Sequence, residues 1–234
     1  MSAPPTQPPN LAPSLRLPSD LVLGYRGPAW KGAAECAVLR LDCDIELNAG
    51  LHFIIAANGS GKTTLMRTLA GLQGPLRGHL ALPMQAWYYA DDLSYAPELN
   101  AAMIFAALLP PSWMPQAMRL AQRLRLDCDR PCGQLSRGSR QKITLVLAET
   151  RAQCSAGTLL LQDESLAGID AWTRREIASL WASPSQDHCR LLALHETDAL
   201  EHADSILSIE QGVLRQHRVE DTRHLRQLCQ DLIA

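Results

Sequence analysis

The sequence lacks several features that would place it in a class at once. It has no uninterrupted apolar run near the roughly 20 residues that a membrane-spanning helix needs. Residues 1–10 contain neither a basic nor an apolar segment, so we expect no secretory signal there. The formal net charge is only −2, which gives no electrostatic reason to expect a nucleic-acid partner. We therefore expect a protein of the cytoplasm or of a cytoplasmic membrane face.

The cysteines lack a pairing pattern. There are 7, an odd number, scattered through a chain with no secretory signal, which argues for reduced thiols. Cys128 and Cys132 lie close together, but no second pair accompanies them. Packing or exposure without function is therefore favoured over a metal site.

The bulk composition is that of a folded domain with a different N-terminus. With 234 residues and 47% hydrophobic content, the chain can bury a full core as one large domain or as a domain plus a lobe. Residues 1–19 are rich in proline, which favours extended, solvated backbone, so we expect a disordered tail. A proline-rich recognition segment is the alternative, but no P-x-x-P with basic flanks stands out.

The rest of the chain is organised around residues 51–64. The apolar residues 53–57 predict a buried strand, a small glycine-containing turn follows, and residues 65–70 have the apolar spacing of an amphipathic helix. Strand, glycine loop and helix in that order make a phosphate-binding loop credible. Its backbone N–H groups and side chains would come from Asn58, Gly59, Ser60, Gly61, Lys62, Thr63 and Thr64.

Each residue type in this loop suits an anion. Gly59 and Gly61 let the backbone curl so that several N–H groups point at one phosphate, and the helix N-terminus adds partial positive charge. Lys62 can reach the β- and γ-phosphates, and the Thr63 hydroxyl can bind Mg²⁺. Ala56 stands where the pattern G-x-x-x-x-G-K-[ST] has glycine. The plainer alternative is a glycine-rich turn with a surface lysine.

Hydrophobic patterns predict the remaining elements. We expect a small helical lobe inserted into a sheet domain, because the helical spacing at residues 100–109 and 115–126 interrupts a series of strands. Strands are predicted at residues 21–25, 38–47, 78–82, 87–90, 158–162, 191–194, 205–210 and 213–216, and further helices at residues 140–153, 174–181 and 221–233.

Polar residues at the ends of these elements are the other candidates for chemistry. The strand at residues 158–162 ends in Asp163 and Glu164, and the strand at residues 191–194 ends in His195. Ser136 can cap the helix that follows it, and Gly138 lets backbone N–H groups approach an anion. A solvated turn, a helix cap or an ordinary strand-end histidine would explain these residues without function.

An aromatic residue before the phosphate loop could hold a base. Tyr25 lies on a predicted edge hairpin, where its ring could stack on adenine, and Trp30 competes for that role. A packed edge aromatic is the alternative for either residue.

Taken together, a phosphate loop, a Leu-Ser-x-Gly sequence before a helix, a strand ending in Asp-Glu and a strand ending in His resemble the ATP-binding cassette (ABC) transporter family over residues 21–215. The resemblance implies an α/β fold, a P-loop NTPase core with a mainly parallel sheet. It also implies an antiparallel β subdomain on the N-terminal side and an inserted α-helical subdomain at about residues 93–140. The ATPase domain would span residues 20–218 and a C-terminal helix residues 219–234.

The resemblance also implies roles for single residues. The loop from Asn58 to Thr64 would hold ATP and Mg²⁺, with Asp163 binding the metal through water. Glu164 would act as general base towards the attacking water, and His195 would sense the γ-phosphate. Asp170 would lie in the loop that meets a partner, and Ser136 and Gly138 would contact the nucleotide on that partner, which implies a homodimer or heterodimer of ATPase subunits.

Several positions depart from the family pattern. Arg137 stands where the signature has Gly, Ser139 where it has Gln, and Ser165 where Pro follows the Asp-Glu pair. The glutamine that normally follows the strand at residues 87–90 is missing, and Asp91 or Asp92 occupies its place. A carboxylate can still bind magnesium, but it cannot donate a hydrogen bond as an amide does.

The hypothesis from the sequence is an ATP-hydrolysing subunit of an ABC transporter, peripheral on the cytoplasmic face of the inner cell membrane. It would dock an integral membrane subunit through its helical lobe. The short lobe and the Leu-Ser-Arg-Gly sequence resemble export-type subunits, including the haem exporter of cytochrome c maturation. The alternatives are a soluble ABC-type regulatory or assembly ATPase and a nucleotide-binding module with little turnover. The cargo cannot be read from the sequence, because the membrane subunit chooses it in this family.

Overall fold

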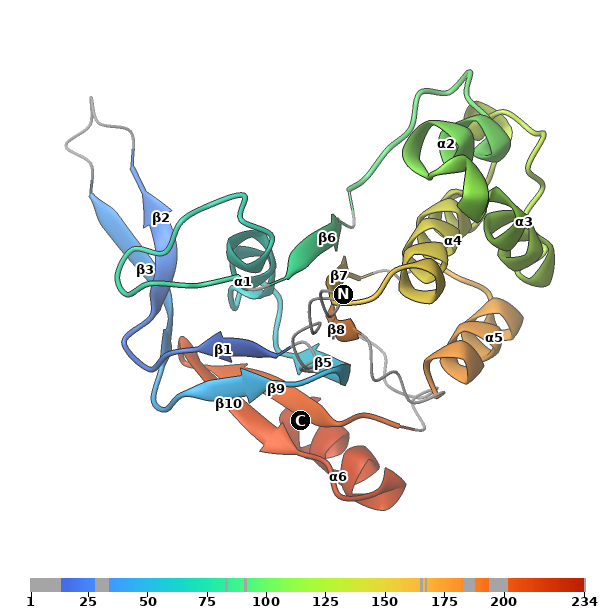
Figure 1. Ribbon diagram of the computed structural model, residues 1–234. Coiled ribbons are helices and arrows are strands. Elements are labelled where there is room, and N and C mark those ends of the chain that lie inside the picture. The colour runs from blue at the N-terminus through green and yellow to red at the C-terminus, as the bar shows by residue number, and fades with distance from the viewer. Residues whose placement is uncertain are drawn as a thin grey trace, which may run out of the picture.

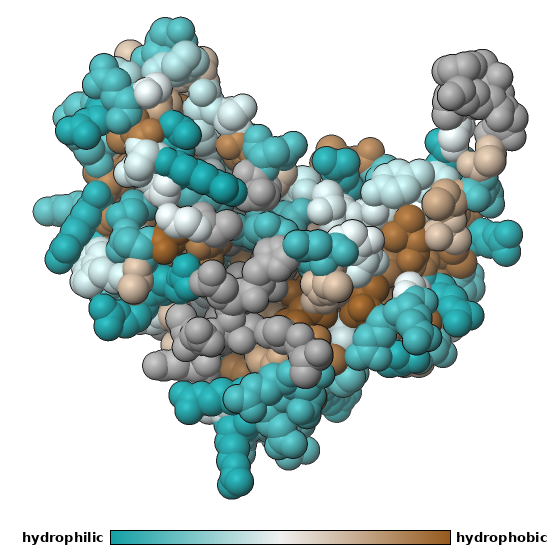
Figure 2. All heavy atoms as spheres, turned by 180° about the vertical axis from the view of Figure 1, so that it is seen from behind, coloured by the Kyte–Doolittle hydropathy of each residue, from teal (hydrophilic) through white to brown (hydrophobic). Residues whose placement is uncertain are grey.

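The computed structural model describes residues 14–27, 34–82, 84–90, 92–164, 166, 168–182, 188–193 and 202–233 (Figure 1). Two regions are distinguishable in the ribbon, a sheet region and a group of helices set apart from it. Figure 2 shows the same arrangement from behind, with a broad notch between the helical lobe and the β2–β3 hairpin. No helix in the described part of the chain is long and apolar enough to cross a membrane.

An eight-stranded sheet forms the centre, in the order β2-β3-β10-β9-β5-β8-β7-β6. Its parallel part contains β6 (Gln85–Tyr89), β7 (Thr158–Asp163), β8 (His188–Ala193), β5 (Gly50–Ile55) and β9 (Ser205–Glu210). Every residue of β5, β7 and β8 is buried, as expected for parallel strands covered on both faces. The predicted mainly parallel core is confirmed.

The other end of the sheet is mainly antiparallel. It contains β2 (Val22–Arg26) and β3 (Glu35–Leu41), which pair with each other, and β10 (Val213–Arg218), which forms a hairpin with β9. Strand β10 joins the two regions because it also pairs with β3, in this case in parallel. This is the antiparallel β region that the resemblance implies, and it brings β2 and β3 next to the loop that follows β5.

Helices cover the two faces of the sheet. On one face, α1 (Lys62–Leu69) packs against the buried side chains of β5, β7 and β8. On the other face, α4 (Arg137–Cys154), α5 (Ala171–Trp181) and α6 (Thr222–Ile233) contribute to a second core cluster. Since alternate residues of a strand point to opposite faces, each central strand contributes to both clusters.

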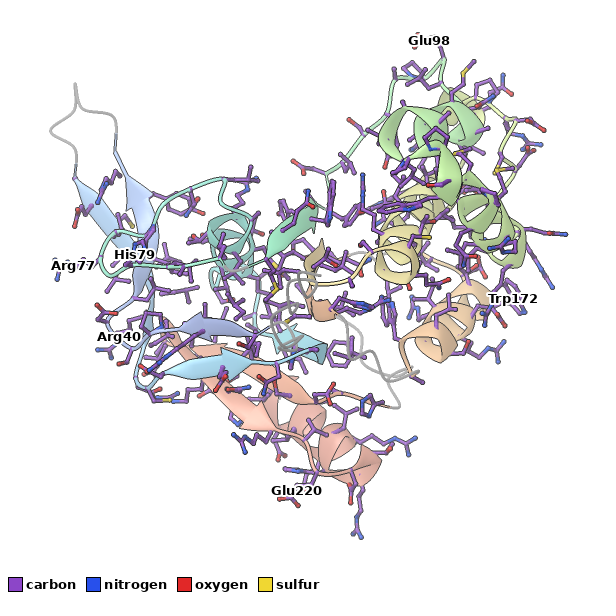
Figure 3. The ribbon with its side chains drawn as sticks, viewed as in Figure 1. Arg40, Arg77, His79, Glu98, Trp172 and Glu220 are labelled. Carbon is purple, nitrogen blue, oxygen red and sulfur yellow. The ribbon has the colours of Figure 1, made fainter. Side chains whose placement is uncertain are left out.

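The helical lobe contains α2 (Ala101–Leu108), a short 3₁₀ turn (Pro111–Trp113) and α3 (Met114–Arg123), packed beside α4. Asn100 caps α2, because its side chain accepts a hydrogen bond from the N–H of Met103 at 2.9 Å. The lobe also contacts α5. There the Arg125 guanidinium lies 4.1 Å from the ring centroid of Trp172, which is labelled in Figure 3.

The prediction of a disordered tail up to residue 19 is wrong for its last part. Strand β1 (Leu15–Leu17) pairs antiparallel with β4 (Ile45–Leu47) in a separate two-stranded sheet. Leu15 and Leu17 are fully buried, while Arg16 between them is exposed. Alternating leucines therefore outweigh the proline content of this segment, because burying both side chains stabilises an extended strand. Residues 1–13 lie outside the described part.

The single strand predicted at residues 38–47 is two strands. Strand β3 ends at Leu41, and β4 begins at Ile45 in the other sheet. Between them, the Asp44 carboxylate accepts hydrogen bonds from the backbone N–H of Ser19 at 2.8 Å and from Arg16 at 2.6 Å. The hydrophobic alternation continues through the break, so periodicity alone could not reveal where the chain changes sheets.

No strand forms at residues 78–82, all of which the structure describes. Gly78 has a φ of 78°, and a Cβ there would lie 3.0 Å from the carbonyl oxygen of Asp20. The backbone therefore turns at Gly78 instead of extending, although Leu80 and Leu82 still pack against the core. Only Arg77 makes a β-bridge here, with Val22.

Two helices begin earlier than their patterns predict. Ser136 is the N-cap of α4, as the sequence predicts, but the helix begins at Arg137 rather than Arg140. Helix α5 begins at Ala171 rather than Arg174, with Asp170 as its N-cap. In each case the capping side chain accepts a hydrogen bond from the backbone N–H three residues further on. Capping chemistry, rather than the first apolar residue, fixes these boundaries.

Candidate active site

The loop between β5 and α1 is shaped by two glycines in the left-handed region. Gly59 has a φ of 76° and Gly61 a φ of 109°. A Cβ on Gly61 would lie 2.7 Å from Cγ1 of Val38, so a side chain at this position would clash as well as strain the backbone. Gly61 is also the N-cap of α1 and provides no side-chain cap, which leaves the N–H groups of the first turn for a ligand.

Lys62 is turned back over this loop. Its ammonium donates hydrogen bonds to the carbonyl oxygens of Ala56 at 2.9 Å and Ala57 at 3.1 Å, and the residue is only 5% exposed. The buried charge is therefore directed into the loop. Ala56 is not among the residues with positive φ, so alanine fits where the sequence pattern has glycine.

Two hydroxyl groups donate to the carboxylate at the end of β7. Thr63 Oγ1 donates to Asp163 Oδ2 at 2.9 Å, and Tyr88 Oη donates to the same atom at 3.3 Å. Burial raises the pKa of Asp163, the Thr63 bond opposes this shift, and neighbouring Glu164 adds to it. A carboxylate destabilised by burial gains from a nearby cation, and hydroxyl and carboxylate oxygens are ligands that Mg²⁺ prefers.

Tyr88 is the member of this group that sequence analysis did not select. It lies in β6, opposite Leu161 of β7 in the parallel register. Burial, and then the charge of Asp163, raise the pKa of Tyr88 to about 12, which keeps its hydroxyl protonated. The signal available in the sequence was that neighbouring parallel strands end at the same edge of a sheet, which brings the end of β6 beside the end of β7.

Glu164 directly follows β7 in an unusual backbone conformation. Its φ is 50°, which is uncommon for a residue with a side chain, and its N–H donates to the carbonyl oxygen of Ala193 in β8 at 3.1 Å. Strain of this kind gathers at functional sites. The strand pairing and this bond hold Glu164 at the edge of the sheet, towards the phosphate loop.

A cavity of about 220 Å³ lies between these groups. Its lining residues come from the phosphate loop and α1, from β2 and β3, and from the end of β7; they are Tyr25, Val38, Asn58, Gly59, Gly61, Lys62, Thr63, Thr64 and Glu164. Most of the residues predicted to hold a nucleotide are thus brought together in one place. Ser60 is a loop residue that does not line the cavity.

Tyr25 stands at the edge of the cavity. The residue is 46% exposed, and its hydroxyl is joined to Thr64 Oγ1 by a hydrogen bond of 2.5 Å. A partly exposed aromatic residue whose hydroxyl is held suits stacking on a base. Stacking on adenine stays a prediction, and the competing Trp30 lies outside the described residues.

The signature residues are elsewhere in the chain. Ser136 is exposed and caps α4, accepting a hydrogen bond from the N–H of Ser139 at 3.1 Å. Gly138 packs against the loop that follows Glu164, because a Cβ on it would lie 2.6 Å from the carbonyl oxygen of Gly168. Neither residue lines the cavity. The site that one chain builds therefore does not include them.

Asp170 has a structural role in this chain. Its carboxylate accepts hydrogen bonds from the N–H and the hydroxyl of Thr173, each at 2.8 Å, and pairs with Lys142 of α4 at 3.0 Å. Partial burial acts to raise the pKa of Asp170, but the bonds from Thr173 and Lys142 outweigh it and lower the pKa. Asp170 thus links α5 to α4 and is not part of the cavity.

Asp91, Asp92 and His195 are the remaining candidates from the sequence. Asp92 is exposed and does not line the cavity, so its role as a metal ligand stays a prediction. Asp91 and His195 lie outside the described residues.

A family model described as "ABC transporter" matches residues 42–167, which is more than half of the chain. The chain belongs to the ABC transporter family. Within that family the chain matches the nucleotide-binding subunits, as the order of its motifs predicts.

Curated relatives of this ABC domain include transporters of both directions. A "Macrolide export ATP-binding/permease protein MacB" of Bordetella avium is 27% identical over 208 residues, covering 77% of this chain and 31% of the relative. A "Molybdenum import ATP-binding protein ModC" of Aromatoleum aromaticum is 30% identical over 175 residues, covering 64% of this chain and 44% of the relative. The chain thus spans about a third of the length of the MacB relatives that it matches.

Solved structures share the fold of this ABC domain. An ATP-binding subunit of an ABC transporter superposes with a TM-score of 0.71 at 20% identity, covering 92% of this chain and 94% of that one. A dimeric, post-hydrolysis ATP-binding cassette bound to ADP and Pi gives a TM-score of 0.65 at 15% identity, covering 88% of this chain and 99% of that one. The predicted fold class is confirmed.

Proposed function

We propose that this ABC domain hydrolyses ATP to drive an export-type transporter, through ATP-dependent dimerisation and a separate membrane-spanning partner. The observation that carries the ATPase part is the single cavity shared by Lys62, Thr63 and Glu164, with Asp163 bonded to Thr63 at its edge. Export is supported by the names of the MacB relatives and by the Leu-Ser-Arg-Gly signature. The ModC relative, named as an importer, keeps import as the second candidate.

The residues present fit ATP and Mg²⁺. The helix N-terminus that Gly61 opens and the Lys62 ammonium would hold the phosphates, and the oxygens of Thr63 and Asp163 would hold the metal. Bound Mg²⁺ would supply neutralisation of the charge on the reacting phosphates. Glu164 would orient the attacking water and accept its proton.

A second ATPase subunit, identical or related, would complete the site. Ser136 and Gly138 do not line the cavity of their own chain, and Ser136 is exposed, so both are available to a partner's nucleotide. The dimeric cassette with ADP and Pi among the solved neighbours supports this arrangement. In the transporter, the domain would sit at the cytoplasmic face of the cell membrane and dock an integral membrane subunit.

The ATPase and dimer proposals are tested together with Glu164→Gln. We expect steady-state ATP turnover to fall to background and an ATP-bound dimer to accumulate in size-exclusion chromatography with light scattering, because the variant binds the substrate but lacks a base. Glu176→Gln is a matched control, since Glu176 lies on α5 and pairs with Arg123 at 2.8 Å, away from the cavity. Unchanged turnover in Glu164→Gln, without a trapped dimer, would refute the assignment.

The transporter part is tested by purification from membranes of the source cell. Co-purification with a multi-span membrane protein encoded by a neighbouring reading frame, at a fixed ratio, is the expected result. Recovery from the soluble fraction alone, with ATPase activity intact, would instead favour the regulatory or assembly ATPase. Binding of ATP without measurable turnover in the unmodified chain would favour a nucleotide-binding module.

A further inference from the structure

We propose that Tyr88 is a positioning residue for the magnesium carboxylate Asp163, and that it links the metal site to strand β6. The proposal rests on the magnesium role of Asp163 proposed above. Tyr88 belongs neither to the phosphate loop nor to the Asp-Glu pair, and it comes from the strand at the edge of the sheet. Its hydroxyl nevertheless contacts the carboxylate directly.

The contact fixes one oxygen of the carboxylate. An ionised carboxylate only accepts hydrogen bonds, so the Tyr88 hydroxyl is the donor in its 3.3 Å bond to Asp163 Oδ2. Thr63, which belongs to α1 rather than to β6, donates a hydrogen bond to that same atom at 2.9 Å. Neither bond uses Oδ1. Two donors from two elements thus hold the carboxyl group in one orientation, and neither of them occupies the other oxygen.

Arg67 lies near this contact. It is on α1, one turn after Thr63, and its positive charge acts to lower the pKa of Tyr88, against the larger effects of burial and of the Asp163 charge. The Tyr88 hydroxyl stays protonated and therefore remains a donor to Asp163.

Strand β6 carries this contact towards the helical lobe. After Tyr89, the chain runs through residues 90–100 into α2. That segment contains no glutamine, and the carboxylates of Asp91 and Asp92 cannot donate a hydrogen bond to Asp163. The Tyr88 hydroxyl supplies a donor that they cannot. A shift of β6 relative to β7 would therefore change the orientation of the metal carboxylate.

The adjacent tyrosine provides a matched control. Tyr88 faces α1, whereas Tyr89 faces the opposite side of the sheet, where its hydroxyl accepts a hydrogen bond from Arg151 of α4. Each loses one hydroxyl on substitution by phenylalanine, but only Tyr88 touches Asp163. Tyr89 is the more buried of the two, so loss of a buried hydroxyl would affect Tyr89→Phe at least as much as Tyr88→Phe. Weaker metal binding in Tyr88→Phe alone would therefore come from the lost contact with Asp163.

The experiment measures metal binding separately from activity. Full-length chain is titrated with Mn²⁺ in the presence of a non-hydrolysable ATP analogue, and bound metal is followed by electron paramagnetic resonance. We expect Tyr88→Phe to raise the half-saturating Mn²⁺ concentration about 3- to 10-fold, the effect of one lost hydrogen bond. Nucleotide affinity in EDTA should stay unchanged, and Tyr89→Phe should keep the half-saturating Mn²⁺ concentration of the unmodified chain.

An unchanged Mn²⁺ half-saturation in folded Tyr88→Phe overturns the proposal. If that variant cannot be obtained folded, Tyr88→Met, which also lacks the hydroxyl, decides by the same titration: a raised half-saturation supports the contact and an unchanged one overturns it. If the unmodified chain shows no nucleotide-dependent Mn²⁺ binding, the magnesium site itself fails and the role of Tyr88 fails with it. Normal binding there, combined with a normal Tyr88→Phe variant, overturns only the role of Tyr88.

Discussion

The Thr63 hydroxyl donates a hydrogen bond to the Asp163 carboxylate at 2.9 Å, although the two residues are 100 positions apart in the sequence. The contact joins the first turn of α1 to the end of β7. The contact is possible because α1, which follows the loop, packs against β7. A hydroxyl from the first turn of α1 and a carboxylate from β7, which is separated from β5 by β8, thus form one group of oxygen atoms.

Removal of the Lys62 ammonium should weaken nucleotide binding. We expect Lys62→Ala to lower ATP affinity about 10- to 100-fold in isothermal titration calorimetry, the effect of losing a charge-assisted hydrogen bond to phosphate. Arg77→Ala, which removes an exposed cation outside the cavity, is the control and should bind ATP as the unmodified chain does. An affinity retained by Lys62→Ala would mean that the loop is not the phosphate site.

Gly61 should tolerate a side chain less well than Gly59. Both have positive φ, so alanine at either position costs about 1 kcal/mol in backbone strain. Only at Gly61 does the new Cβ also clash, 2.7 Å from Val38 Cγ1, whereas nothing lies within 4 Å at Gly59. Thermal unfolding should therefore show a larger loss of Tm for Gly61→Ala than for Gly59→Ala.

The packing part of this difference can be relieved. Combining Val38→Ala with Gly61→Ala removes the atom that the new Cβ meets, so the double variant should recover part of the Tm lost by Gly61→Ala. Equal losses in the two single glycine variants, or no recovery in the double variant, would contradict the steric explanation.

Glu149 and Arg190 should depend strongly on each other for stability. Both are buried, and the Arg190 guanidinium donates two hydrogen bonds to the Glu149 carboxylate at 2.5 and 3.0 Å. We expect Glu149→Leu to lower the free energy of unfolding by about 3–5 kcal/mol, because it leaves the guanidinium charge unpaired in the core. Urea denaturation measures this change.

The double variant of this pair separates pairing from burial. With both residues replaced by leucine, no unpaired charge remains, so the loss in stability should be much smaller than in Glu149→Leu. Trp181 Nε1 donates a hydrogen bond to Glu149 at 2.9 Å and loses this partner in both variants. The stability cost of that lost bond is therefore the same on both sides of the comparison. Additive losses from the two single substitutions would show that the ion pair contributes no coupling.

Local patterns predicted much of the site. The loop from Asn58 to Thr64 and the Asp163-Glu164 pair could be found because each combines a strand with a polar end, and such patterns depend on neighbouring residues alone. The predicted order of strands and helices was also largely right. The break between β3 and β4, the strand at Leu15–Leu17 and the turn at Gly78 were not predicted, because the partners that decide them are distant in the sequence.

By itself, the sequence determined the family, the α/β class and the candidate residues for phosphate binding, since those follow from short-range periodicity and motif order. Only the tertiary structure decided that Tyr88 reaches Asp163, that Glu149 meets Arg190, and that Ser136 lies outside the cavity of its own chain. These facts depend on which faces of which elements pack together. That choice is made by the burial of the whole core, and no stretch of neighbouring residues encodes it.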